Sequence, residues 1–249
     1  VPRLVSSLAT QRLIHAGVGS NAKSDMSNRK ADDIKKDMID KLGNDFGSLI
    51  YTLYNEVTWL TFKWLEFSEL YGSKETRVEL LNQSAPFFFF TIQKVLWDNL
   101  ILGIARLTDP SESMRKRNIT LNAIPAFLSD INFRNEIEHD IDELITESKF
   151  CRDRRNKIIA HMDYDLGIDV QNAKALEPAT RTKLRSVIER IQSIYNKVEF
   201  KYLGTTTAYK YLQSDLGAIS LLHTIESGIR FNEQAFERRK RGEDINYNY

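Results

Sequence analysis

Apolar side chains recur at intervals of three and four residues through most of this chain, and few helix-breaking residues interrupt them. The sequence holds five prolines and eleven glycines among its 249 residues. Because an α-helix turns once in about 3.6 residues, this spacing gathers apolar side chains on one face of each helix. The pattern therefore predicts an all-α fold, a helical bundle of long antiparallel helices.

Glycine, proline and polar clusters mark the expected ends of these helices. We expect helices over residues 32–42, 45–71, 86–108, 121–128, 133–162, 180–200 and 207–239. Ser84 is expected to cap the third helix, with Pro86 in its first turn. We expect residues 1–30 to be a disordered or extended N-terminus, residues 31–240 a single helical domain, and residues 241–249 a frayed tail.

The most apolar stretch spans residues 85–107 and begins with Phe87 to Phe90. Because this stretch is apolar on all sides, we expect a buried central helix, and Asp98 and Arg106 argue against a membrane span. Its phenylalanines, with Trp59, Trp64 and Trp97, are interpreted as core rather than as a base-stacking surface. The sequence thus predicts no membrane partner.

Composition limits the remaining classes of function. The single cysteine, Cys151, excludes an internal disulfide and a multi-cysteine zinc site, and it is typical of a cytoplasmic protein. No residue cluster has convincing zinc spacing, and Asp163 and Asp165 are interpreted as loop carboxylates, so we expect no metal and no cofactor. Residues 1–25 weakly resemble a transit peptide ahead of an alternative start at Met26, and their origin stays open.

The stretch "CRDRRNKIIAHMD", residues 151–163, contains an arginine followed at short range by a histidine. A second match, Arg134 to His139, lies upstream, and about one such match is expected by chance, so spacing alone decides nothing. Local charge separates the two. Residues 149–157 hold five basic side chains against one acidic, a net of +4, whereas residues 134–147 hold one arginine against six acidic side chains, a net of −5. RNA phosphate would be attracted to the first and repelled by the second.

The chemistry of the two residue types supports a phosphodiester site. Arginine can hold a phosphate and stabilise transition-state charge, and histidine can transfer a proton near neutral pH. On an ideal helix Arg154 and His161 share a face, whereas Arg155 and His161 diverge by about 120°. The choice of arginine therefore stays open, as does the alternative of a basic helix whose histidine caps or packs within the bundle.

Together with "WDNLILGIARLTDP" at residues 97–110, the stretch "RDRRNKIIAHMD" resembles the HEPN superfamily, and more narrowly its AbiU-type branch linked to bacterial abortive infection. The resemblance covers roughly residues 45–200. It implies a helical bundle that dimerises so that two motifs face one another, often as a metal-independent endoribonuclease. In such enzymes the 2′-hydroxyl attacks the neighbouring phosphate and leaves a 2′,3′-cyclic phosphate and a 5′-hydroxyl.

Carried onto this sequence, the resemblance makes Arg155 the motif arginine, which would bind the phosphate with Arg154 as reserve, and His161 the motif histidine, which would transfer the proton. Asn156 matches the polar residue after the arginine and would orient one of these two side chains. We expect Arg154, Arg152 and Lys157 to bind the substrate RNA. Arg106 and Asp109 either support this site or form an ion pair at the end of their own helix. The basic tail around Arg239 is interpreted as solvated.

Two other classes of function fit the same residues. One is a non-catalytic HEPN module that binds RNA, a nucleotide or a protein through the same basic groove. The other is an assembly subunit whose dimer surface is its whole function. The partners expected from the leading interpretation are RNA, a second copy of the chain, and an antitoxin or another component of a toxin-like anti-phage defence system.

Overall fold

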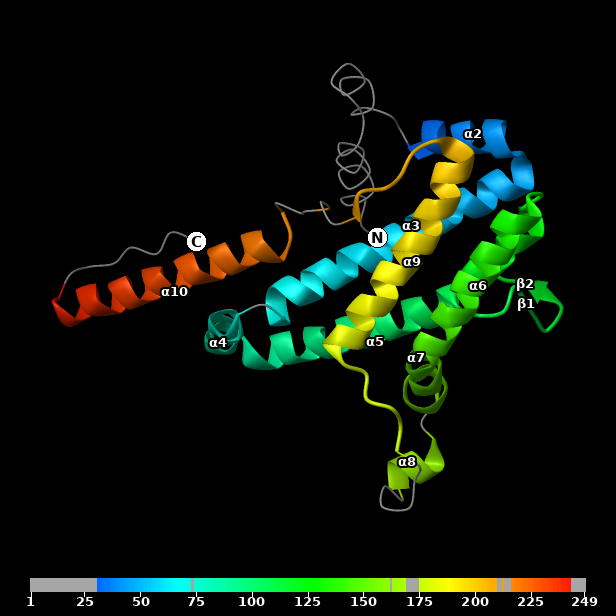
Figure 1. The fold of residues 1–249 in the computed structure, drawn as a ribbon. Helices are drawn as coiled ribbons and strands as arrows, with labels where there is room; N and C mark the ends of the chain where they lie inside the picture. The colour runs from blue at the N-terminus through cyan, green and yellow to red at the C-terminus, as the bar shows by residue number, and fades with distance from the viewer. Residues whose placement is uncertain are drawn as a thin grey trace. The chain divides into compact units, whose positions relative to one another are not determined.

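The computed structural model describes residues 31–72, 74–161, 163–168, 175–209, 212 and 216–242. Helices dominate these residues, and the prediction of an all-α fold is confirmed (Figure 1). The expected N-terminus, residues 1–30, and most of the expected tail, residues 243–249, lie outside the described part of the chain.

The helices keep most of the expected order but not all of the expected bounds. The α-helices are α2 (Ala31–Leu42), α3 (Asn44–Tyr71), α4 (Glu75–Ser84), α5 (Pro86–Leu107), α6 (Ile131–Glu147), α7 (Lys149–Arg154), α8 (Tyr164–Ile168), α9 (Arg181–Leu203) and α10 (Ala218–Lys240). Shorter elements are the strands β1 (Glu112–Ser113) and β2 (Lys116–Arg117), the 3-10 turns η2 (Leu121–Ala123) and η3 (Pro125–Phe127), and a π-helical turn η4 (Arg155–Ile159).

The described helices form two compact units, one from the described residues within 31–62 and 98–212, the other from those within 63–97 and 216–242. Helices α3 and α5 each contribute residues to both units. A single domain over residues 31–240 stays a prediction.

Antiparallel pairing organises the first unit. Along α9, Arg190, Lys197 and Lys201 form ion pairs with α6 at Glu143 (2.7 Å), Asp140 (2.6 Å) and Asp130 (2.9 Å), respectively. Because the partners on α6 fall in number as those on α9 rise, the two helices run in opposite directions, as Figure 1 shows. This pairing is the geometry that the sequence predicts.

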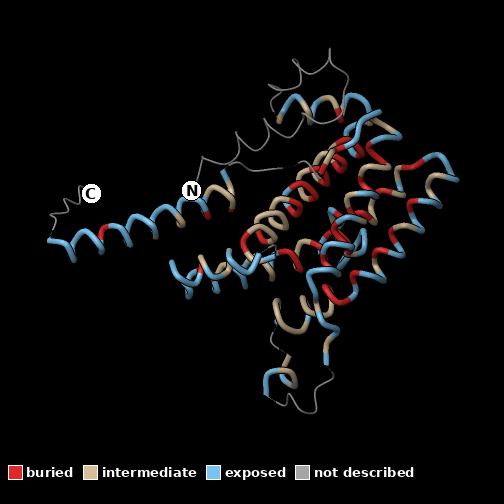
Figure 2. Tube along the Cα trace, turned by 60° about the vertical axis from the view of Figure 1, so that its left-hand side comes forward, coloured by how far each residue is buried: buried red, intermediate tan, exposed pale blue. Residues whose placement is uncertain are grey.

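The core of the first unit lies between α3, α5, α6 and α9. Figure 2 shows the buried positions along the facing sides of these helices. Its fully buried members include Leu53, Val57, Leu100, Ile101, Ile104, Ile137, Leu144, Leu184 and Ile191. Within each helix these residues recur at intervals of three, four or seven, so the helical periodicity of the sequence is the periodicity of this core.

The expectation that Phe87 to Phe90 are core is wrong for three of the four. The exposed fractions of Phe87, Phe88 and Phe90 are 82%, 57% and 66%, and only Phe89 is buried. Trp59 is also exposed, while Trp64 and Trp97 are half-buried. The first turns of α5 have neighbours on one side only, so an all-apolar sequence there does not imply burial on every side.

Helix α5 is also the one helix of the described residues that is long and apolar enough to cross a membrane, by length and composition alone. The expectation that the whole stretch 85–107 is buried is wrong, because its burial is confined largely to the C-terminal half. The predicted absence of a membrane partner stays a prediction.

Two other helix expectations are wrong because tertiary contacts replace local signals. Helix α4 was not expected, and Ser84 belongs to its last turn, where its hydroxyl donates to the carbonyl of Leu81 instead of capping α5. Helix α10 begins at Ala218 rather than near residue 207, because the carboxylate of Glu66 accepts a 2.6 Å hydrogen bond from the Ala218 amide. A side chain at Gly217 would collide with that carboxylate, so the glycine allows this cap.

The segments next to the basic motif also differ from their expected form. The segment between the expected helices 86–108 and 121–128 holds the β1–β2 hairpin, and the expected helix 121–128 is a pair of 3-10 turns. The segment between the expected helices 133–162 and 180–200 contains α8. The expected long helix 133–162 begins at Ile131 and divides at Ser148, whose amide closes the last turn of α6. It then ends in the π-helical turn η4.

Candidate functional site

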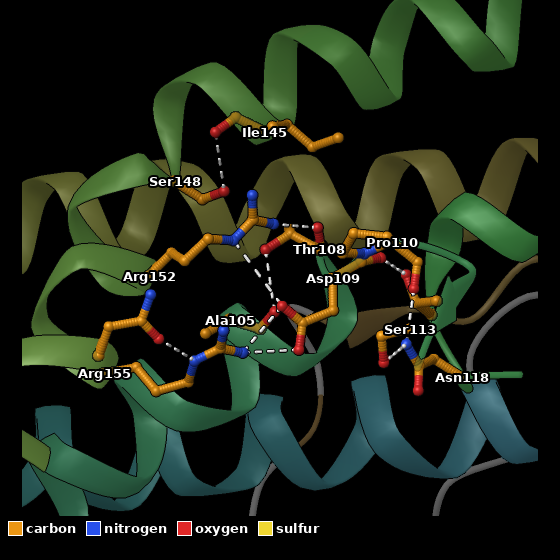
Figure 3. Close-up of polar contacts among 12 residues, drawn as sticks. Ala105, Thr108, Asp109, Pro110, Ser113, Asn118, Ile145, Ser148, Arg152 and Arg155 are labelled. Carbon is orange, nitrogen blue, oxygen red and sulfur yellow. Dashed lines mark hydrogen bonds and ion pairs between the residues drawn. The ribbon is translucent and has the colours of Figure 1, made fainter. Parts of the chain in front are cut away.

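The candidate site is built on the C-terminal end of α5, where backbone carbonyls have no partner within the helix. Side chains from later in the sequence satisfy these carbonyls, and Figure 3 shows one of them, Arg152 at the carbonyl of Thr108. The Thr120 hydroxyl lies 3.0 Å from the carbonyl of Leu107 and 2.7 Å from that of Asp109, and the Asn122 amide donates to the carbonyl of Asp109 at 3.0 Å. Arg152 on α7 donates to the carbonyl of Thr108. These bonds hold the turn that carries Asp109 in one conformation.

Asp109 on this turn binds Arg155, the motif arginine. Nη1 of Arg155 donates to both carboxylate oxygens of Asp109, at 2.8 and 2.6 Å, and Nε donates to the side-chain oxygen of Asn156 at 3.0 Å (Figure 3). Both members of the ion pair keep 24% of their side-chain surface exposed. The guanidinium is therefore fixed on two sides and still open to solvent.

The pairing leaves one edge of the Arg155 guanidinium available. Nη2 makes no hydrogen bond in the described part of the chain, and it is not among the buried unpaired atoms. A guanidinium presents its N–H donors in a rigid planar fork that fits phosphate oxygens. Arg155 can thus hold Asp109 with one terminal nitrogen and an oxyanion with the other.

The backbone at the motif is unusual. Residues 155–159 form the π-helical turn η4, in which the Ala160 amide bonds to the Arg155 carbonyl at 2.8 Å, five residues back. Turns of this kind are rare in proteins, and those that occur are often found at functional sites. The helix ends at Ile159, so the ideal-helix angle between Arg155 and His161 does not apply to them.

His161 lies just beyond this turn and is exposed. It makes no hydrogen bond or ion pair with any residue that the structure describes, including Arg155. The expectation that it caps a helix or packs within the bundle is wrong, because its imidazole faces solvent. Its two ring nitrogens are available to another molecule.

The other predicted binding residues are divided between two environments. Arg152 is held in place, since one nitrogen donates to Thr108 and Nε lies 3.8 Å from the Asp109 carboxylate, buried without a hydrogen-bond partner. Arg154 and Lys157 are half-buried and form no ion pair with the described residues. The structure thus gives Arg152 a structural contact and leaves Arg154 and Lys157 unpaired.

Of the two alternatives for Arg106 and Asp109, a place in the candidate site holds for Asp109, and an ion pair at the end of their own helix holds for neither. The expected ion pair at the end of their own helix is wrong, because Arg106 binds Glu56 of α3 at 2.6 Å while Asp109 binds Arg155, 46 residues further along the chain. Asp109 therefore belongs to the candidate site. Its signal in the sequence was the "ARLTDP" segment that carried the family resemblance.

Of the rival motif on α6, His139 is exposed, as expected, whereas Arg134 is half-buried. His139 is within 3.5 Å of Glu143, and Arg134 donates to the carbonyl of Leu128. Burial raises the pKa of Cys151 to about 12, so its thiol is protonated at neutral pH and is a poor nucleophile. Asp163 accepts a hydrogen bond from the Leu166 amide in the first turn of α8, which agrees with its interpretation as a loop carboxylate.

Among the described residues, no group of three or more histidine, cysteine or acidic side chains is placed to hold a metal ion.

Comparison with known proteins gives one match. The family model described as AbiU2, HEPN_AbiU2, matches residues 43–220, which span the whole candidate site. No curated protein and no solved structure matches the chain. The chain belongs to the AbiU2 family of HEPN domains.

Proposed function

We propose that this HEPN domain is a metal-independent endoribonuclease of a bacterial anti-phage defence or toxin-like system. The observation that carries the proposal is the contrast between Arg155, fixed by Asp109 and Asn156, and His161, which is exposed and has no partner among the residues that the structure describes. Catalysis requires a held phosphate-binding group and a base that is free to exchange protons. Family membership supports the same assignment.

In the proposed reaction, Nη2 of Arg155 binds a non-bridging oxygen of the scissile phosphate. The 2′-hydroxyl of the preceding ribose loses its proton to a histidine and forms a bond to phosphorus, while the bond from phosphorus to the 5′-oxygen breaks. The departing 5′-oxygen takes a proton from a histidine. The products are a 2′,3′-cyclic phosphate and a 5′-hydroxyl, and the reaction consumes no other reactant.

The proposal includes a homodimer. One histidine cannot be deprotonated and protonated at the same moment, so a base and an acid acting together require two His161 side chains, one from each copy. Local charge supports RNA as the substrate, because Arg154 and Lys157 have no acidic partner among the described residues and Arg152 and Arg155 share one carboxylate. The proposed setting is the cytoplasm.

The test is RNA cleavage in the presence of EDTA by the wild-type protein, His161→Ala and His139→Ala. The second variant is a matched control, because it removes an exposed histidine from the rival motif of the same chain. We expect wild type and His139→Ala to release fragments with cyclic phosphate ends, and His161→Ala to be at least 100-fold slower.

Both variants should remain folded, since neither histidine is buried. Cleavage by a folded His161→Ala protein at the wild-type rate would remove His161 from the mechanism. RNA binding without cleavage by any of the three proteins would favour the non-catalytic HEPN module.

A further inference from the structure

The β1–β2 hairpin beside the site presents basic side chains that the proposed mechanism does not use. Strand β1 pairs antiparallel with β2, Glu112 opposite Arg117 and Ser113 opposite Lys116, and Met114 and Arg115 form the connecting turn. Arg115, Lys116 and Arg117 are exposed and form no hydrogen bond or ion pair through their side chains with the described residues. Even Glu112, directly opposite Arg117, closes no ion pair with it.

The turn of this hairpin is strained. Met114 and Arg115 have φ angles of 48° and 61°, and in the described residues they are the non-glycine positions with positive φ. A two-residue turn with positive φ at both positions favours asparagine and glycine, which this chain does not use here. Strained backbone of this kind is concentrated at functional sites. Met114 at the tip is 97% exposed, so packing of its side chain does not explain the turn.

Both ends of the hairpin are anchored to the turn that carries Asp109. The Asn118 side-chain amide donates to the carbonyl of Pro110 at 2.8 Å and to the Ser113 hydroxyl at 3.0 Å, and the Asn118 backbone amide donates to Ser111 at 2.8 Å (Figure 3). The basic tip follows Asp109 by six residues, so it lies within about 22 Å of the residue that holds Arg155.

The tripeptide of the hairpin, Arg115 to Arg117, has a second copy in the chain, and the side chains of that copy have interaction partners. Arg-Lys-Arg occurs at residues 115–117 and again at residues 239–241, at the end of α10. In the second copy Lys240 binds Glu237 at 2.9 Å, and Arg239 and Arg241 also have interaction partners. The hairpin copy has none of these contacts in the described structure. The difference lies in the surroundings and not in the sequence of the tripeptide.

We propose that the β1–β2 hairpin binds the RNA backbone next to the Arg155 site, with Arg115, Lys116 and Arg117 contacting phosphates. This inference rests on the proposed function and names a substrate-binding element for it. Unpaired cations on an anchored arm gain counterion-release free energy on binding phosphate without first breaking an internal ion pair.

The test measures RNA affinity against salt in a His161→Ala background, which prevents cleavage during titration. The probe is a fluorescein-labelled single-stranded RNA of mixed sequence, titrated by anisotropy in EDTA. The hairpin variant is Arg115→Gln/Lys116→Gln/Arg117→Gln, and its matched control is Arg239→Gln/Lys240→Gln/Arg241→Gln. A third variant, Arg115→Lys/Arg117→Lys, keeps the charge of the hairpin and tests whether side-chain shape alone affects the protein.

We expect the hairpin variant to bind at least tenfold more weakly than its parent at about 100 mM salt. Its slope of log K against log salt should be shallower by about 2, since each lost phosphate contact removes about 0.7. The control and the charge-keeping variant should stay within about twofold of the parent. Circular dichroism confirms that each protein is folded.

The outcomes separate this inference from the proposed function. If the parent binds RNA and the hairpin variant matches it in affinity and slope, the hairpin is not a binding element and the proposed function stands. Equal losses in the hairpin variant and its control would also overturn the inference, because they would reflect net charge alone. If the parent does not bind RNA even at about 50 mM salt, the proposed function itself fails.

Discussion

At the scale of single residues, Asp109 determines the orientation of the Arg155 guanidinium. A free arginine on a helix surface samples many rotamers, and holding it by a carboxylate removes that freedom before the substrate arrives. The Asp109 carboxylate places one negative charge near the bound phosphate. Arg152, which lies close to the same carboxylate, offsets that charge. Asp109 is therefore a positioning residue in the proposed site.

Replacing Asp109 by asparagine should separate binding from catalysis. We expect the single-turnover cleavage rate to fall by about 10- to 100-fold, because Arg155 loses its fixed orientation. RNA affinity should hold or rise, because one negative charge is removed. The matched control is Glu56→Gln, which breaks the ion pair of Arg106 between α5 and α3 and should leave the rate unchanged. A loss of affinity in Asp109→Asn would argue against this role.

Glu199 is a second residue whose environment has a measurable effect, here on the pKa of its carboxylate. Its carboxylate is buried beside the Thr207 hydroxyl at 3.0 Å, near Tyr54, Tyr195 and Tyr209, and burial raises its pKa from 4.5 to about 7. The folded state therefore binds this proton more tightly than the unfolded state. Its contribution to stability is present below pH 4.5 and is lost as the pH rises to about 7.

Glu199→Gln should remove this dependence. At pH 8 the variant should exceed the wild type in free energy of unfolding by up to about 3 kcal/mol, and near pH 4 the two should be similar. Urea unfolding at both pH values measures the difference. Equal stabilities at pH 8 would show that the contacts of the Glu199 carboxylate offset the cost of burying its charge.

At the scale of elements, the beginning of α5 shows how a continuous apolar sequence divides between core and surface. Phe89 packs in a cluster with Leu70, Leu81, Ala218 and Leu222, whereas the phenylalanines on either side of it are exposed. Four adjacent phenylalanines on a helix point in four directions, about 100° apart. Only one of these directions meets α3, α4 and α10.

Because only one of these phenylalanines is buried, the same substitution by alanine should change the free energy of unfolding by different amounts. Phe89→Ala should lower the free energy of unfolding by about 3 kcal/mol, as removal of a buried aromatic ring does. Phe87→Ala and Phe90→Ala should each change it by less than about 0.5 kcal/mol. Chemical denaturation of the three variants measures this, and equal losses would mean that the exposed rings are covered in solution.

At the scale of the whole molecule, the proposed site requires two copies. In the described residues no contact joins His161 to Arg155 of the same chain. In the proposed mechanism the two histidines of a dimer act as base and acid, so a dimer with a single His161 should be inactive.

Mixing wild type with an equal amount of His161→Ala should therefore lower the activity of the wild-type chains once subunits have exchanged. Random exchange leaves wild-type dimers as a quarter of the population, so about a quarter of the activity of an all-wild-type sample is expected, against half if each chain acted alone. Sedimentation of each protein alone checks that it is a dimer. Half of the all-wild-type activity would show that one His161 per dimer is sufficient.

The sequence by itself determined the helical class, the order of the long helices and the basic stretch that carries the candidate site. These features depend on contacts between residues three or four apart and on charges that lie close together along the chain, so periodicity and composition report them directly. Thr180 before α9 and Gly204 after it, for example, end that helix through local hydrogen bonds.

Only the tertiary structure decided which residues meet. Asp109 and Arg155 lie 46 residues apart, and Glu66 caps a helix that begins at Ala218. The same holds for the two copies of Arg-Lys-Arg, which are identical in sequence and differ in the partners around them. Burial and pairing depend on how helices pack against one another, and packing is a property of the whole chain that no local pattern contains.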